Sequence, residues 1–365
     1  MNDPFRIDSH KLIYHPRRVA ELIECGGDWD KAKGIYPLYV EISPLGACNH
    51  RCSFCAVDFV GYKSTRLDAA LLGERLREMG RLGVKSIMLA GEGEPLLHKE
   101  LPRMVVDAGE AGLDVAITSN ATVLPPRFLE DALPRLSWFK ASINAGTPVS
   151  YAAIHRTRER DFHKAVDNLR RMVETRRRDK LSCTLGAQAL LLPDNAGEMA
   201  TLARLCRDDI GLDYLVVKPY SQHQLSHTRT FAELDYAPYA ELGKELAACA
   251  TADFRVIFRS QTMARYESNE RYTTCRAVPF LWAYIMADGT VSGCSAYLLD
   301  PRFEYGNINT ATFQEIWEGE RRRQAVPFVA HELDIGGCRR SCRMDAINGY
   351  LHQLTEEPVP HVNFI

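Results

Sequence analysis

The sequence contains no long hydrophobic run, neither at the N-terminus, where a signal peptide would need one, nor later, where a bilayer-spanning helix would. We therefore expect a cytoplasmic protein without a membrane partner. The chain also lacks an excess of charge of one sign, because 45 Lys and Arg residues balance 47 Asp and Glu residues to a net charge of −2. Bulk charge thus gives no attraction for nucleic acid, and no nucleic-acid partner is predicted. Solenoid-length repeats and low-complexity tracts are missing as well.

Cysteine, in contrast, is abundant, with eleven residues in a chain of 365. In a reducing compartment such cysteines favour metal ligation or packing over disulfides. Seven of them fall into two loop-borne groups, which indicates two metal sites. Buried packing is the default explanation for the spare cysteines in predicted helices and at a strand start. The four spare residues are Cys25, Cys183, Cys206 and Cys249.

The first group comprises Cys48, Cys52 and Cys55 in one loop, with Cys-x3-Cys-x2-Cys spacing. Three thiolates on a four-iron cluster leave one iron without a protein ligand. An open metal position is typical of a reactive site, as it is for catalytic zinc. Zinc itself is the alternative, and His50 lies between the first two cysteines. Zinc, however, usually prefers two Cys-x2-Cys pairs and a closed shell.

Short apolar runs alternate with helical patterns from about residue 38 to 220, which is typical of repeated βα units around a parallel sheet. Six units are too few for a complete eight-stranded barrel, so the predicted fold is α/β with a partial, TIM-like (β/α)6 barrel. The predicted strands are 38–43, 84–90, 113–119, 139–143, 185–192 and 214–218.

The pattern changes after the sixth strand. A helix is predicted from about Phe231 to Ala250, and Asp288 with Gly289 forms a turn pair that favours a tight β-hairpin. A small α+β domain is therefore expected to follow the barrel. The predicted segments are an N-terminal extension (1–37), the barrel (38–220), a linker with a helix (221–265), the small domain with the second cysteine group (266–350) and a C-terminal tail (351–365).

A second motif directly follows the second predicted strand and consists of Gly91, Glu92, Gly93, Glu94 and Pro95. Gly93 leaves room for a close approach to the backbone, and the Glu94 carboxylate is a hydrogen-bond acceptor. Alone, the motif would suit an ordinary strand-to-helix turn. It gains weight because it comes one βα unit after the cysteine loop.

In this order the two motifs resemble those of the radical S-adenosylmethionine (radical SAM) superfamily, whose cysteine motif has an aromatic residue where Phe54 stands. The resemblance implies that Cys48, Cys52 and Cys55 hold a 4Fe-4S cluster and that SAM chelates its fourth iron. It further implies that the glycine-rich turn receives the SAM amino group. Glu92 stands where many members have a glycine.

Weaker matches follow at the ends of the next two predicted strands. Ser119 and Asn120 end the third strand, and Ser142 and Asn144 end the fourth, where similar proteins hold the SAM ribose and carboxylate. Arg156 lies shortly after and is expected to pair with that carboxylate. Each residue has a plain alternative as a cap or turn residue.

The second group, whose members are Cys275, Cys294, Cys338 and Cys342, has a Cys-x13-Gly-x4-Cys opening across the predicted hairpin. This pattern resembles the SPASM and twitch extensions of some radical SAM proteins. The resemblance implies one fully ligated auxiliary 4Fe-4S cluster, held in the shorter twitch manner and suited to electron transfer. A structural zinc with four thiolates suits the count equally well.

By the same resemblance, the protein is an enzyme that takes one electron from a flavodoxin- or ferredoxin-type donor and cleaves SAM to a 5'-deoxyadenosyl radical. The radical then abstracts hydrogen from a small-molecule substrate. We expect oxidation of a small polar metabolite such as a sugar, aminocyclitol or nucleoside, because residues 1–37 are too few for a peptide-recognition domain. The alternatives are a peptide maturase, a redox-neutral epimerase or decarboxylase, and a zinc-stabilised binding module.

Catalytic candidates follow the sixth predicted strand, where a parallel barrel places its chemistry. Lys218 and Tyr220 are candidates for substrate contact or proton acceptance. Gln222 and His223 are weaker candidates, because the alternative for both is a solvated loop position.

Overall fold

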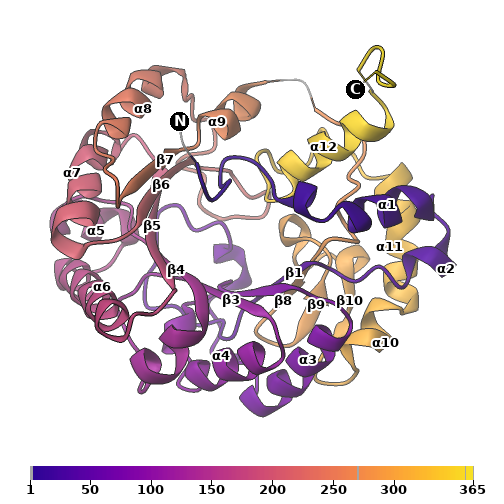
Figure 1. Ribbon diagram of the computed structural model, residues 1–365, viewed down its shortest axis with the longest axis horizontal. Coiled ribbons are helices and arrows are strands. Elements are labelled where there is room, and N and C mark those ends of the chain that lie inside the picture. The colour runs from indigo at the N-terminus through magenta and orange to yellow at the C-terminus, as the bar shows by residue number, and fades with distance from the viewer. Residues whose placement is uncertain (1–2, 269–270, 358, 365) are drawn as a thin grey trace.

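One ten-stranded sheet organises the computed structural model, which describes residues 3–268, 271–357 and 359–364. The strand order is β10-β9-β8-β1-β2-β3-β4-β5-β6-β7, and the sheet curves into an open barrel (Figure 1). From β8 through β1 to β7, each strand runs parallel to its neighbour. Strand β9 pairs antiparallel with β8 on one side and with β10 on the other. The strands are β1 (Tyr39–Ile42), β2 (Ser86–Leu89), β3 (Asp114–Ser119), β4 (Leu136–Ser142), β5 (Thr184–Leu191), β6 (Tyr214–Pro219), β7 (Arg255–Phe258), β8 (Trp282–Ile285), β9 (Thr290–Ser292) and β10 (Glu304–Asn307).

Helices cover the outer face of this sheet (Figure 1). Within the described residues, no helix combines the length and apolarity that crossing a bilayer requires. The α-helices are α1 (Pro16–Cys25), α2 (Trp29–Ala32), α3 (Ala69–Arg81), α4 (Leu101–Glu110), α5 (Pro148–His155), α6 (Glu159–Asp179), α7 (Met199–Arg204), α8 (Ala240–Ala247), α9 (Ser260–Glu267), α10 (Phe313–Trp317), α11 (Glu320–His331) and α12 (Asp345–Thr355).

The structure confirms all six predicted barrel strands and the hairpin, which β8 and β9 form. It adds β7, which lies in the segment expected to be a linker and extends the parallel sheet beyond β6. The helix predicted from Phe231 is wrong at its start, because α8 begins at Ala240 after a short 3-10 turn, Ala237–Tyr239. Pro238 in that turn has no backbone N–H for a helix interior, so it sits where a helix begins.

The inner face of the barrel has its own apolar contacts, separate from the main core under the helices. Tyr214 and Val216 of β6 and Ile257 of β7 pack there against Phe5 and Ile7. The ring centroids of Phe5 and Tyr214 are 5.2 Å apart. Since Tyr214 is the first residue of β6, Phe5 lies at the amino end of that strand. Asp8 accepts from the Gln261 and Thr262 N–H groups just after the carboxyl end of β7, so the N-terminal extension runs along this side of the barrel.

A buried arginine joins the N-terminal extension to the C-terminal helices. Arg322 of α11 is 0% exposed. Its guanidinium lies 4.3 Å from the centroid of the Trp317 ring. It donates hydrogen bonds of 2.7–3.3 Å to five backbone carbonyls, which belong to Ala32, Lys33, Ile35, Pro279 and Trp317. One side chain thus satisfies the backbone of three separate segments.

Candidate functional site

The first cysteine loop follows β1 at the carboxyl end of the barrel. Cys48, Cys52 and Cys55 are free thiols and partly buried. Burial is the main cause that raises the pKa of Cys48 to about 12. Thiolates in such a place need a compensating cation, and bound metal supplies one.

Close packing joins the glycine-rich turn to this loop. A Cβ added to Gly93 would lie 2.2 Å from the Leu45 carbonyl oxygen and 2.4 Å from that of Ala47. The Glu94 N–H donates to the Ala47 carbonyl at 2.9 Å. The missing side chain of Gly93 therefore allows the two loops to pack against each other.

Replacing this glycine should separate the two loops. We expect Gly93→Ala to lower the free energy of unfolding by about 1–3 kcal/mol, because backbone oxygens cannot move aside as a flexible side chain can. Denaturant unfolding of the metal-free protein measures the change. Gly197→Ala is the matched control, since nothing lies within 4 Å of a Cβ there. Equal stability of the two variants would contradict the packing argument.

The carboxylate of Glu94 is held by three donors. Its Oε1 accepts from Ser119 Oγ at 2.6 Å and from the Leu96 N–H at 2.9 Å, and its Oε2 accepts from the Asn120 N–H at 2.8 Å. Glu94 is 3% exposed, and burial raises its pKa. The same residue caps the 3-10 helix Pro95–Leu97. The structure thus brings together Glu94, Ser119 and Asn120, three of the residues expected to contact SAM.

Asn49, which the sequence analysis missed, connects this carboxylate to the cysteine loop. Asn120 Nδ2 donates to Asn49 Oδ1, and Asn49 Nδ2 donates to Thr122 Oγ1, both at 2.8 Å. Asn49 follows Cys48 directly. The cysteine loop, the glycine-rich turn and the end of β3 therefore form one hydrogen-bonded unit.

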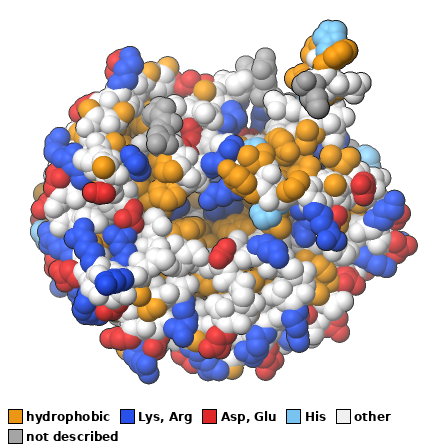
Figure 2. All heavy atoms as spheres, viewed as in Figure 1, with side chains coloured by type: hydrophobic (Ala, Val, Ile, Leu, Met, Phe, Trp, Pro, Cys, Tyr) orange, Lys and Arg blue, Asp and Glu red, His pale blue; other side chains and the backbone are white. Residues whose placement is uncertain are grey.

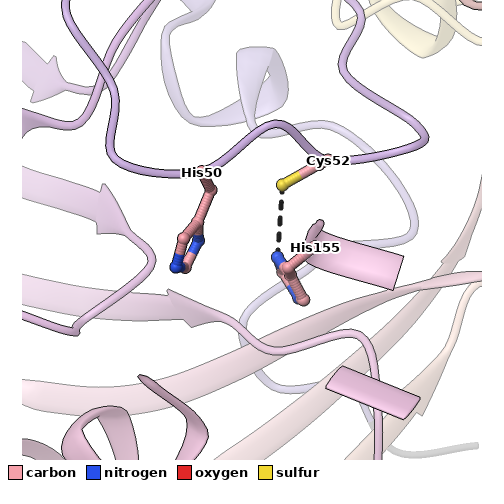
Figure 3. A group of neighbouring side chains, drawn as sticks. All are labelled: His50, Cys52 and His155. Atoms are coloured by element: carbon pink, nitrogen blue, oxygen red, sulfur yellow. Dashed lines mark hydrogen bonds between the residues drawn. The ribbon is translucent and has the colours of Figure 1, made fainter. Parts of the chain in front are cut away.

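His155 at the end of α5 also contacts the cysteine loop and was missed by the sequence analysis. The Asn144 N–H donates to His155 Nε2 at 3.2 Å, so the ring proton is assigned to Nδ1. His155 Nδ1 lies 3.2 Å from Cys52 Sγ (Figure 3) and therefore donates to it. Burial lowers the pKa of His155 well below its usual value, which keeps the ring neutral. His50 lies beside this pair, and the three ligand atoms are within 4.8 Å of one another.

The remaining residues expected to contact SAM differ in their surroundings, because Asn144 and Phe54 contact other parts of the protein and Arg156 is exposed. Asn144 uses its side chain inside the protein, where Oδ1 accepts from the Leu190 N–H at 2.7 Å and Nδ2 donates to Ser142 Oγ at 3.4 Å. Phe54 stands edge-on to His155, with ring centroids 5.5 Å apart. Arg156 is exposed, and its backbone N–H caps the end of α5. Its side chain makes no hydrogen bond or ion pair with the described residues.

The four cysteines of the second group come together from distant parts of the chain. Burial raises the pKa of Cys294 well above its usual value, and neighbouring Cys275, Cys342 and Cys338 raise it further. Asn348 Nδ2 donates to Cys275 Sγ at 3.3 Å. All four are free thiols. The structure therefore gathers the predicted set.

The spacing of the sulfur atoms tests which metal the two groups suit. Four thiolates at about 2.3 Å from one zinc would stand about 3.8 Å apart. No three of the seven sulfurs, all in the described part of the chain, lie within 4.8 Å of one another. A four-iron cluster binds each cysteine at a different iron and so needs wider spacing. Both groups fit such a cluster.

The catalytic candidates after β6 are enclosed by protein. Tyr220 is 2% exposed, its hydroxyl donates to Gln222 Oε1 at 3.1 Å, and burial raises its pKa to about 12. The solvated-loop alternative is wrong for His223, which is 0% exposed. Its Nδ1 accepts from the Leu225 N–H, so its Nε2 donates to the Ser295 carbonyl at 3.0 Å. Burial lowers the pKa of His223 to about 4. Lys218 lies two positions after Val216 on the inner face of β6.

Comparison with curated proteins gives relatives over part of the chain. This chain is 27% identical over 197 residues to a GTP 3',8-cyclase of Chlorobaculum tepidum, and the match covers 53% of this chain and 57% of that protein. It is 32% identical over 201 residues to a GTP 3',8-cyclase of Stenotrophomonas maltophilia, covering 53% and 55%. The chain thus spans little more than half the length of these relatives.

Solved structures share the fold at lower identity. The crystal structure of Streptococcus suis SuiB matches with a TM-score of 0.62 and 18% identity, covering 78% of this chain and 66% of that one. The structure of anSMEcpe with bound AdoMet matches with a TM-score of 0.57 and 16% identity, covering 85% and 90%. These matches support the partial barrel followed by an auxiliary domain.

Family models account for both cysteine groups. Residues 42–206 match the radical SAM superfamily. Residues 275–343 match SPASM, an iron-sulfur cluster-binding domain. Both matches support the expected cofactors, which are 4Fe-4S clusters and SAM. The chain belongs to the radical SAM superfamily and carries a C-terminal SPASM-type iron-sulfur domain.

Proposed function

We propose that this protein is a radical SAM enzyme that reductively cleaves SAM and abstracts hydrogen from a small polar metabolite. The observation that carries the proposal is the hydrogen-bonded unit of the cysteine loop, the glycine-rich turn and the end of β3. When bound, the cluster and SAM supply the one-electron reduction and the hydrogen-atom abstraction. The protein contributes binding, orientation and exclusion of water.

Cys48, Cys52 and Cys55 would hold the SAM-binding cluster, and the second cysteine group would hold the auxiliary one. Glu94 would accept hydrogens from the SAM amino group, because three donors fix its carboxylate and no other described residue donates to its fourth lone-pair direction. Ser142 and Arg156 remain candidates for the ribose and carboxylate of SAM. Asn144 would act indirectly, by fixing His155 against Cys52.

The proposed substrate is a sugar, aminocyclitol or nucleoside, which the enzyme oxidises by removing two hydrogens. The names of the curated relatives, GTP 3',8-cyclases, support the nucleoside or nucleotide end of this range. We further propose an external one-electron donor of the flavodoxin or ferredoxin type. Cys338 and Arg339 line an open cavity of about 550 Å³, so one auxiliary ligand lies next to solvent-accessible space.

Modification of a peptide is the second candidate function. One solved neighbour is described as SuiB bound to its precursor peptide SuiA, with a TM-score of 0.62 and 18% identity. At this identity the likeness supports a shared fold only. We therefore keep a small metabolite as the proposed substrate of this chain.

Anaerobic reconstitution followed by incubation with SAM, reductant and a metabolite extract tests the proposal. Formation of 5'-deoxyadenosine together with a compound that loses two hydrogens would support oxidation. An unchanged mass with deuterium uptake from heavy water would support epimerisation instead. If only a leader-bearing peptide were modified, the metabolite proposal would be lost.

His155 should tune the first cluster. Its N–H···S bond to Cys52 stabilises negative charge on the sulfur, so it favours the reduced cluster. We expect His155→Phe to shift the midpoint potential of that cluster to a more negative value. An EPR-monitored redox titration measures the shift. His163→Phe, on the exposed side of α6, is the control and should leave the potential unchanged.

A further inference from the structure

Two lysines lie on the inner face of the barrel, where strand residues alternate between the helices and the interior. Lys140 follows Trp138 by two positions on β4, and Trp138 belongs to the inner contacts with Met88. Lys218 follows Val216 by two positions on β6, and Val216 packs against the N-terminal extension inside the barrel. Both side chains therefore enter the interior.

A third cation stands beside Lys218. The pairing of Val217 with Phe258 makes Lys218 and Arg259 the next neighbours across β6 and β7. The Arg259 N–H donates to the Val217 carbonyl at 2.9 Å, which fixes this alignment. Neighbouring strands are about 4.8 Å apart, and like charges in adjacent positions destabilise a sheet.

Neither lysine has an anionic partner. Among the described residues, no hydrogen bond or ion pair reaches Lys140 Nζ or Lys218 Nζ. Lys140 Nζ lies 4.9 Å from the centroid of the Trp138 ring, which is a weaker interaction. Burial lowers the pKa of Lys140 to about 7 and that of Lys218 well below its usual value, and nearby cations add to both shifts. Burying these unpaired lysines therefore lowers the free energy of unfolding.

Two neighbouring carboxylates pair with arginines and not with the lysines. Glu41 Oε2 pairs with Arg343 at 2.8 Å. Asp8 accepts from Thr262 Oγ1 at 2.7 Å and forms an ion pair with Arg259 Nε at 3.6 Å. Figure 2 shows that this face of the molecule is hollowed at its centre, with Lys or Arg side chains in the hollow. Around Lys140 and Lys218, the cations among the described residues therefore outnumber the carboxylates.

We propose that Lys140, Lys218 and Arg259 form a binding site for an anionic oxygen group of the substrate, a phosphate or a carboxylate, inside the barrel. The inference rests on the proposed function, because it assigns this anion to the molecule that the enzyme oxidises. The ammonium groups donate to the anionic oxygens, and the anion offsets the repulsion between neighbouring cations. The site lies on β4, β6 and β7, apart from the Glu94 unit at β1, β2 and β3.

Thermal unfolding and calorimetric titration of the anaerobically reconstituted protein test the site, with inorganic phosphate and malonate as probes. The variants are Lys140→Met and Lys218→Met. The control is Lys244→Met on the outer helix α8, where Lys244 pairs with Glu241 at 2.7 Å. Without added anion, we expect Lys218→Met to melt at or above the wild-type temperature, because an enclosed unpaired charge is removed.

With anion, we expect stabilisation of the wild type and the control, and at least tenfold weaker binding by Lys140→Met and Lys218→Met. Stronger binding of phosphate would indicate a phosphorylated substrate, and stronger binding of malonate a carboxylated one. Equal binding by all four proteins, or weaker SAM binding with unchanged anion binding, would overturn the inference. Failure of the wild type to cleave SAM while anion binding persists would instead defeat the proposed function.

Discussion

Cys52→Ala should abolish SAM cleavage, leaving no more 5'-deoxyadenosine than a reaction without protein. In the described part of the chain, His50 and His155 lie within 4.8 Å of Cys52, and they offer nitrogen atoms in place of a thiolate. Iron content should fall by one cluster, and the auxiliary cluster should remain. Chromatography of the products and iron analysis of the reconstituted variant measure both effects.

Cys206→Ala is the matched control for this loss. Cys206 is fully buried in the main core, and burial raises its pKa to about 12, so it is a packing residue. Its replacement should lower stability by about 1 kcal/mol and preserve SAM cleavage. Wild-type cleavage by Cys52→Ala would refute the assignment of the first cysteine loop.

Arg322→Met should produce the largest loss of stability, about 3–5 kcal/mol, because five backbone carbonyls would lose their buried donor. Methionine keeps much of the side-chain volume, so the change reports on hydrogen bonding and charge more than on a cavity. Denaturant unfolding with a far-UV probe measures the difference.

The next residue provides the comparison. Arg323 is 59% exposed and pairs with Glu320 at 3.5 Å on the surface of α11. Arg323→Met should change the free energy of unfolding by less than about 0.5 kcal/mol. If the two variants were equally stable, the carbonyl contacts of Arg322 would not hold the N-terminal extension to the C-terminal helices.

The barrel could be predicted because its strands are continuous apolar runs between helical patterns, as buried parallel strands require. Strand β7 escaped prediction, although Val256, Ile257 and Phe258 form an apolar run, because four residues give too little periodicity. The pairing of β8 with β1 is a contact between distant segments, and no local pattern signals it. The packing of Phe5 and Ile7 inside the barrel is of the same kind.

Within the site, spacing in sequence carried the prediction. Cys48, Cys52 and Cys55 are close along the chain, and Glu94 has glycine and proline neighbours that mark its turn. His155 has no such neighbours, and its bond to Cys52 depends on how α5 packs against the loop. Lys140 did carry a signal, because a lysine between apolar residues of a barrel strand either faces solvent or serves a ligand. The pairing of β4 with β3 and β5 places Lys140 on the inner face of the barrel, where a ligand can reach it.

The parallel pairing of β8 with β1 bears on how this enzyme class can be re-engineered. Exchanging C-terminal modules between relatives is attractive, yet β8 supplies the backbone partners that cover one side of β1, with Tyr39 opposite Trp282 and Ile42 opposite Ile285. A chimera joined after Ile285 would keep this ladder. One joined before Trp282 must reproduce it residue for residue, or β1 becomes an exposed edge prone to aggregation. The position at which two relatives can be joined is therefore set by strand β8 and does not depend on the cysteine spacing of the exchanged module.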